Sequence, residues 1–175
     1  MRVFLIILGI LAVGVAAYLI IMSKNNSNLE SYPYKVVKEY YEFEIRQYAP
    51  SLFTSIRMNS SNYDEVSSNG FSKLAGYIFG GNSRNEKIAM TSPVSVSLED
   101  SMTMMFMVPE KYNKESLPTP NQSDIKFEEI PEKYMAAIRF GGWANDEKIE
   151  SYKNQLIEAL NSKDIARTNK FYFFG

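Results

Sequence analysis

The sequence predicts an α+β domain in which a strand-strand-helix-strand unit occurs twice, preceded by one transmembrane helix. Three observations support this. Aromatic residues make up 14% of the chain, and they favour strands. A single offset of 82 residues aligns two long blocks of the sequence. The first 22 residues contain a long run without charge. We therefore expect an anchor at residues 1–22, a polar linker at residues 23–30 and a folded domain at residues 31–175.

The N-terminal run, Val3–Met22, is 20 residues long, and a helix of that length spans about 30 Å, the thickness of a bilayer core. A cleaved signal peptide would have a shorter apolar run ending in small residues and a polar cleavage site. Here Ala16 and Ala17 are followed by more apolar residues, which favours an uncleaved anchor. Arg2 precedes the run and Lys24 follows it. The positive-inside rule then predicts a single-pass membrane protein with an extracytoplasmic domain.

The domain aligns with itself when it is shifted by 82 residues. This places Ile56 over Ile138 and Leu74 over Leu156 without a gap. One offset that holds through two strands and a helix is difficult to obtain by chance. We therefore expect the two halves to superpose and to form a barrel-like antiparallel sheet with two helices.

The first predicted unit contains a helix with four apolar residues on one face: Phe71, Leu74, Ala75 and Ile78. The start of this helix stays open, because residues 67–70 are poor helix formers. Gly80-Gly81 is typical of a helix C-terminus. The strands of this unit are expected at Tyr40–Tyr48, Leu52–Met58 and Ile88–Leu98, with a turn at Ala49-Pro50.

The second predicted unit has a clearer helix, which starts after Asn145 as N-cap. Its apolar face consists of Ile149, Tyr152, Leu156, Ile157 and Leu160. The strands are expected at Thr103–Val108, Ile125–Ile130, Tyr134–Phe140 and Lys170–Phe174, with a turn at Pro131-Glu132. The segment Tyr112–Gln122 carries two prolines and is predicted to be a loop.

Composition disfavours several function classes. The net charge is −1, whereas a nucleic-acid-binding domain needs a basic face. The chain contains no cysteine and no histidine. It therefore has no thiolate or imidazole for a catalytic triad, a zinc site or an axial haem ligand. We expect no nucleic-acid partner, no dedicated metal site and no enzymatic activity.

Several motifs are more specific than composition. They are Tyr41–Tyr48 (YEFEIRQY), Gly70-Phe71, Tyr77–Asn82 (YIFGGN), Lys87–Val94 (KIAMTSPV), Phe140–Gly142 (FGG) and Phe171–Gly175 (FYFFG). With these motifs, residues 31–175 resemble the SOUL/haem-binding-protein family. The resemblance implies a duplicated, barrel-like fold shared with gyrase-inhibitor-like effector-binding domains. It also implies binding of haem or another tetrapyrrole in a shallow apolar groove.

The resemblance further implies that ligand-binding residues come from the first helix and the last strand: Ser72, Lys73, Gly76, Tyr77, Tyr172 and Phe174. Some family members use a histidine as iron ligand, and this chain has none. A Tyr77 phenolate could take that place if a cation such as Lys73 lowered its pKa. The alternatives are that Tyr77 lies on the flank of the helix and that Lys73 is an ordinary solvated lysine.

Two other features have simpler explanations. The Met-rich run Met102–Met107 could offer thioethers to copper(I), but alternation along a strand divides its sulfurs between two faces, so packing is the better interpretation. Trp143 could stack on a planar ligand, although a place in the core is more usual for tryptophan.

We therefore expect a membrane-anchored binding protein for haem, a related tetrapyrrole or another flat hydrophobic ligand. One alternative is a small-molecule hydrolase on the same fold, and another is an interaction domain without a ligand. A hydrolase without histidine or cysteine would need a carboxylate in a closed pocket. A carboxylate in the largest cavity would therefore favour the hydrolase.

Overall fold

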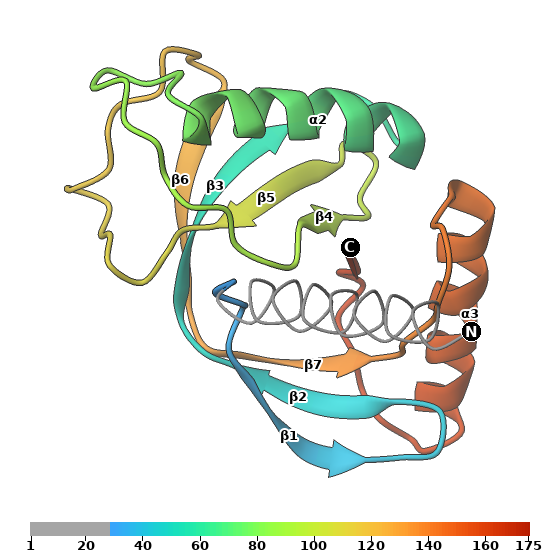
Figure 1. The fold of residues 1–175 in the computed structure, drawn as a ribbon. Coiled ribbons are helices and arrows are strands. Elements are labelled where there is room, and N and C mark those ends of the chain that lie inside the picture. The colour runs from blue at the N-terminus through green and yellow to red at the C-terminus, as the bar shows by residue number, and fades with distance from the viewer. Residues whose placement is uncertain (1–28) are drawn as a thin grey trace, which may run out of the picture. The chain divides into compact units, whose positions relative to one another are not determined.

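Two antiparallel sheets and two helices make up the domain in the computed structural model, which describes residues 29–175 (Figure 1). Residues 31–175 form one unit. This confirms the α+β class with two helices and antiparallel strands. The predicted anchor, Val3–Met22, lies outside the described residues. From residue 29 onward, no helix is long and apolar enough to cross a membrane.

The three-stranded sheet has the order β1-β2-β7, and the five-stranded sheet has the order β6-β3-β5-β4-β8. The strands are β1 Tyr34–Glu39, β2 Glu44–Tyr48, β3 Ser51–Arg57, β4 Ser95–Ser97, β5 Thr103–Met107, β6 Ile125–Ile130, β7 Lys133–Ala137 and β8 Tyr172–Phe174. The helices are α2 Tyr63–Ile78 and α3 Asp146–Asn161. Figure 1 shows α2 over the sheet that contains β3 and β5, and α3 beside the end of β7.

A bent two-stranded ribbon connects the two sheets. β2 pairs with β7 in one sheet, and their continuations β3 and β6 pair in the other. The register continues through the bend, because Tyr48 pairs with Lys133 and Ser51 pairs with Ile130. The predicted turns at Ala49-Pro50 and Pro131-Glu132 are therefore corners of this ribbon, and β2 does not fold back on β3. Proline has no N–H to donate, so it interrupts the ladder at the corner.

The order of elements repeats along the chain. Three strands, a helix and a strand (β1, β2, β3, α2, β4) are followed by the same series (β5, β6, β7, α3, β8). The N-caps of the two helices, Asn62 and Asn145, lie 83 residues apart, whereas Ser55 of β3 and Ala137 of β7 lie 82 apart. The second helix is therefore displaced by one residue from the offset of the strands.

Helix α2 begins earlier than its apolar face indicates. The Asn62 side chain accepts a hydrogen bond from the Glu65 amide at 2.9 Å, and acidic residues in the first turn suit the positive end of the helix dipole. The helix ends as predicted at Gly80-Gly81. Gly80 has φ +112°, and the Gly81 amide donates to the Gly76 carbonyl at 2.8 Å, which forms a Schellman motif.

Three strand predictions need correction. The strand predicted at Tyr40–Tyr48 begins only at Glu44, because the Tyr40 amide donates to the Phe43 carbonyl in the turn of a hairpin. The first strand of that hairpin, β1, was not predicted. The strand predicted at Ile88–Leu98 is confined to β4. Before it, the Ile88 amide donates to the end of α2, and Pro93 has no N–H for a ladder.

The five-stranded sheet carries packed side chains on both faces. The Met-rich run forms β5, and its alternation is as predicted: Met104 and Phe106 pack beneath α2, whereas Met105 and Met107 pack on the other face with Tyr48 and Phe53. A third, smaller cluster packs α3 through Leu156 and Leu160 against Phe43. The run is therefore core, which agrees with the packing interpretation.

A cationic cavity on the α3 side

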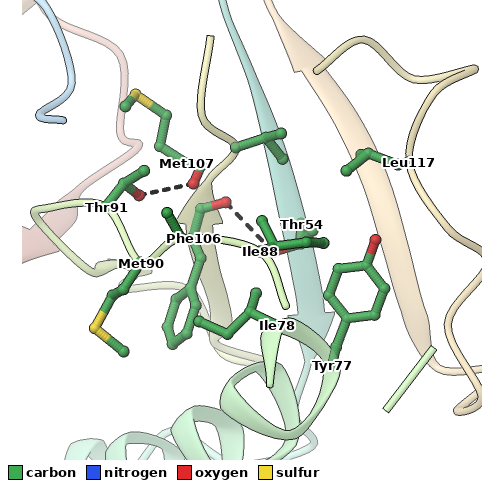
Figure 2. Close-up of a pocket in the computed structure, with 11 residues that line it drawn as sticks. Thr54, Tyr77, Ile78, Ile88, Met90, Thr91, Phe106, Met107 and Leu117 are labelled. Carbon is green, nitrogen blue, oxygen red and sulfur yellow. Dashed lines mark hydrogen bonds between the residues drawn. The ribbon is translucent and has the colours of Figure 1, made fainter. Parts of the chain in front are cut away.

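The α2 side of the domain is nearly filled. Figure 2 shows a small pocket there, in which Tyr77 points from α2 toward Leu117. Its volume is about 10 Å³, close to the smallest space that holds one water molecule. The Tyr77 side chain is 1% exposed, and its hydroxyl donates to the Pro118 carbonyl at 2.9 Å. Tyr77 is thus a core residue, neither a free phenol on a surface nor a residue on the helix flank.

The environment of Tyr77 disfavours a phenolate. Burial raises the pKa of Tyr77 to about 12. Lys73, which was expected to lower that pKa, instead forms an ion pair with Asp124 at 2.8 Å. An iron ligand at this position would require loss of the hydrogen bond to Pro118 and ionisation in an apolar site.

The predicted site residues fall into two groups that the fold does not bring together. Ser72 and Gly76 lie on the exposed surface of α2. Tyr172 and Phe174 lie on β8, where they line a large cavity whose walls contain no residue of α2. The structure therefore separates the helix half of the prediction from the strand half.

This cavity has a volume of about 830 Å³, which lies within the range of sites that bury drug-sized ligands. It is lined by β7, the neighbouring part of β2, the inner face of α3 and the segment from Ile165 to Gly175. Much of its wall is apolar or aromatic: Ile45, Leu98, Met135, Ala136, Ala137, Ile138, Phe140, Ile149, Leu156, Leu160, Phe171, Phe173 and Phe174. A flat hydrophobic molecule would lose much of its water-exposed area there.

The charged residues of the cavity wall all have the same sign. Six cationic side chains line it: Arg46, Lys133, Arg139, Lys153, Arg167 and Lys170. No aspartate or glutamate is among the lining residues. Residues 29–175 also hold no group of three acidic side chains that could bind a metal ion. The cavity can therefore attract an anionic, largely apolar ligand.

Tyr172 forms part of one end of the cavity. Its ring lies 4.4 Å from the ammonium of Lys133, and burial is the largest cause that raises its pKa. Tyr172 is therefore a neutral, aromatic wall residue at pH 7. Trp143, in contrast, is 97% exposed and does not line the cavity, so it lies in neither of the environments considered for it.

Sequence reasoning missed Arg46 and Lys133 as cavity residues. Both belong to strands in which charged and apolar residues alternate, a pattern that usually marks a solvated face. Only the pairing of β2 with β7 shows that this face borders a cavity. Arg46 is part of the YEFEIRQY motif, but nothing in the motif indicates that its guanidinium is buried.

Comparison with known proteins identifies the class of this domain. The chain belongs to the SOUL heme-binding protein family, whose family model matches residues 29–175. It is 27% identical to heme-binding protein 2 of Mus musculus over 139 residues, which cover 75% of this chain and 67% of that protein. It is 24% identical to heme-binding protein 1 of Sus scrofa over 168 residues, 88% of each chain. It is 26% identical to heme-binding protein 1 of Xenopus laevis, over 74% of this chain and 72% of that protein.

Proposed function

We propose that this chain binds haem or a related tetrapyrrole in the cavity between β7, α3 and β8. One observation carries the proposal: an apolar cavity of about 830 Å³ is lined by six cations and by no carboxylate. A tetrapyrrole combines a flat apolar macrocycle with acidic side chains, so it matches both features. The names of the relatives, heme-binding proteins 1 and 2, support the same ligand class.

The cavity also bears on the alternative functions. A hydrolase on this fold was expected to place a carboxylate in the largest cavity, and the lining residues include none. Tyr48, Tyr134, Tyr152 and Tyr172 line the cavity, but a neutral phenol is a poor base at pH 7. A binding protein is therefore the better-supported function. Bound haem would supply its own redox-active iron, whereas the protein would supply apolar area and positive charge.

The test is a titration of the purified full-length chain with protoporphyrin IX and hemin. Ala137 lines the cavity, so Ala137→Leu should fill part of it and weaken binding at least about fivefold. The matched control is Gly76→Leu on α2, where an added Cβ meets nothing within 4 Å. This control should bind like the wild type.

Three outcomes separate the possibilities. Weaker binding by Ala137→Leu alone supports the cavity. Weaker binding by Gly76→Leu alone moves the site to the α2 surface, with Ser72 and Lys73. If the wild type binds neither ligand with a Kd below about 100 μM, about −5.5 kcal/mol, the tetrapyrrole proposal fails.

We also propose that Val3–Met22 anchors the protein in a membrane with residues 31–175 outside the cytoplasm. The support is the uncharged length of this segment and the charges of Arg2 and Lys24. A reporter fused after Gly175 should be active only in the exported compartment. A signal from the cytoplasm would overturn the orientation, and a mature N-terminus near Lys24 would overturn the anchor.

A further inference from the structure

Arg46 is a buried cation in the wall of the cavity, and one of its nitrogens has no partner. The residue is 8% exposed. Its Nε donates to Glu44 at 2.8 Å, and its Nη1 donates to the Tyr48 hydroxyl at 3.2 Å. Its Nη2 is buried without a hydrogen-bond acceptor among the described residues. An unsatisfied donor on a buried charge is costly, so a native structure that retains one calls for an explanation.

Lys133 lies close to Arg46 on the same face of the sheet. Tyr48 pairs with Lys133 and Arg46 pairs with Met135, so Arg46 and Lys133 occupy diagonal positions across the β2–β7 ladder. Lys133 contacts the ring of Tyr172, and between residues 29 and 175 it forms no ion pair with a carboxylate. Burial, followed by the charge of Lys170, lowers the pKa of Lys133. Both effects would be relieved by an anion.

Other cations of the cavity already have acceptors. Arg139 lies 3.5 Å from Glu44 and also donates to Tyr34, Lys153 pairs with Glu150, and Arg167 donates to Asn161. Arg46 differs from them because it is buried, and its charge is fixed. Burial acts to lower the pKa of Arg46, but its hydrogen bonds with Glu44 and Tyr48 outweigh burial and raise it.

We propose that Arg46 Nη2 and the Lys133 ammonium form a carboxylate-binding site in the cavity wall. The ligand would place an acidic side chain there, as a tetrapyrrole with free propionates can, while its macrocycle lies on the apolar wall. This inference rests on the proposed function and deepens it, because it names the ligand group that is recognised. A carboxylate supplies the acceptor that Nη2 lacks and the counter-charge that Lys133 lacks.

The experiment compares protoporphyrin IX with its dimethyl ester, in which the propionates carry no charge. Both ligands are titrated into the full-length chain in the same mild detergent. The wild type should prefer the free acid at least about tenfold, the size expected for a charge-assisted hydrogen bond. Lys133→Gln should weaken binding of the free acid about fivefold and leave binding of the ester unchanged. Arg46→Lys should reduce the preference further, since lysine cannot reproduce the guanidinium fork.

The control is Lys153→Gln, which also removes a cation from the cavity wall but one already paired with Glu150. It should keep the wild-type preference. If Arg46→Lys does not fold, Lys133→Gln alone decides the result. Equal affinity of the wild type for acid and ester would overturn the carboxylate site and leave the proposed function intact. Failure of both porphyrins to bind would overturn the proposed function itself. An equal loss of preference in Lys153→Gln would show that only the general positive charge of the cavity matters, which also overturns the site.

Discussion

On the α2 side of the domain, β5 lies between β3 and β4 and fills the sheet with methionine and phenylalanine side chains. On the α3 side, the strands at the same places in the chain order are β7 and β8. Within residues 29–175 no strand lies between them, and the cavity of about 830 Å³ is found there. The pocket on the α2 side measures about 10 Å³. Two series of elements in the same order thus produce a packed core on one side and a hollow on the other.

The first strand of each series explains this difference. β5 opens the second series and inserts between β3 and β4. β1 opens the first series, but it pairs with the outer edge of β2 and is exposed along its whole length. Because β1 does not insert between β7 and β8, the wall residues of these strands are left facing one another across the cavity. A repeated fold can therefore gain a binding site by placing one strand differently, without a new element.

The largest expected effect tests whether the two sides differ in packing. Leu74 of α2 is fully buried, so Leu74→Ala should lower the free energy of unfolding by about 3 kcal/mol. Leu156 of α3 is 9% exposed and borders the cavity, so Leu156→Ala should cost about 1.5 kcal/mol, mainly the transfer of the lost methyl groups. Urea-induced unfolding, followed by circular dichroism, measures both. Equal losses would show that the α3 side is packed as tightly as the α2 side.

A smaller effect is expected at Tyr77, which belongs to the filled side. Tyr77→Phe leaves the Pro118 carbonyl without its donor and should cost about 1–2 kcal/mol at pH 7. The folded pKa of Tyr77, about 12, lies above the ordinary value of 10.0. The stability that this tyrosine contributes is therefore complete below pH 10 and is lost as the pH rises from 10 toward 12.

Alkaline unfolding of wild type and Tyr77→Phe measures this contribution. The variant should lose less stability between pH 10 and pH 12, although part of the loss remains because burial also raises the pKa of Tyr32 to about 12. Tyr134→Phe, at an exposed residue, is the control and should follow the wild type. The hemin spectrum should be the same in wild type and Tyr77→Phe, since Tyr77 does not line the cavity. A changed spectrum would return Tyr77 to consideration as an iron ligand.

Local signals in the sequence predicted the packed side well. Alternation correctly divided the Met-rich strand between two faces, and Gly80-Gly81 marked the end of α2. These features depend on residues close together in the chain. The start of α2 was left open because the cap at Asn62 and the close approach of Gly70 to Met104 offset a poor helix-forming segment, and the second contact is tertiary.

The hollow side was predicted less well for the same reason. Ala49-Pro50 has the composition of a hairpin turn, but its strands pair with a distant segment, so the ribbon bends there. The burial of Arg46 follows from that pairing and has no local signal. The resemblance correctly pointed to β8, because Tyr172 and Phe174 line the cavity, but it also pointed to α2, whose side chains lie elsewhere.

The smallest expected effect concerns the place where the two series meet. At the start of α2, Asn62 caps the helix and its amide also donates to Asp146 at 2.9 Å, and the Tyr63 amide donates to the same carboxylate at 2.7 Å. At the start of α3, Asn145 caps its own helix by accepting from the Lys148 amide at 2.9 Å. Asp146 thus joins the first turns of the two helices.

If this contact stabilises the domain, Asn62→Ala should cost about 1.5 kcal/mol and Asn145→Ala about 1 kcal/mol, the ordinary value of a cap. A double-mutant cycle of Asn62→Ala with Asp146→Ala should then give a coupling energy of about 0.5 kcal/mol. The control cycle pairs Asn145→Ala with Asp64→Ala, which share no hydrogen bond among the contacts described here, and it should be additive within about 0.3 kcal/mol. The hydrogen bonds of Asn62 and Asp146 are exposed at the surface, so solvent limits their energy. Additivity in both cycles would mean that the packed side and the hollow side are stabilised independently at their helix starts, and that only the bent ribbon and the β4–β8 ladder connect them.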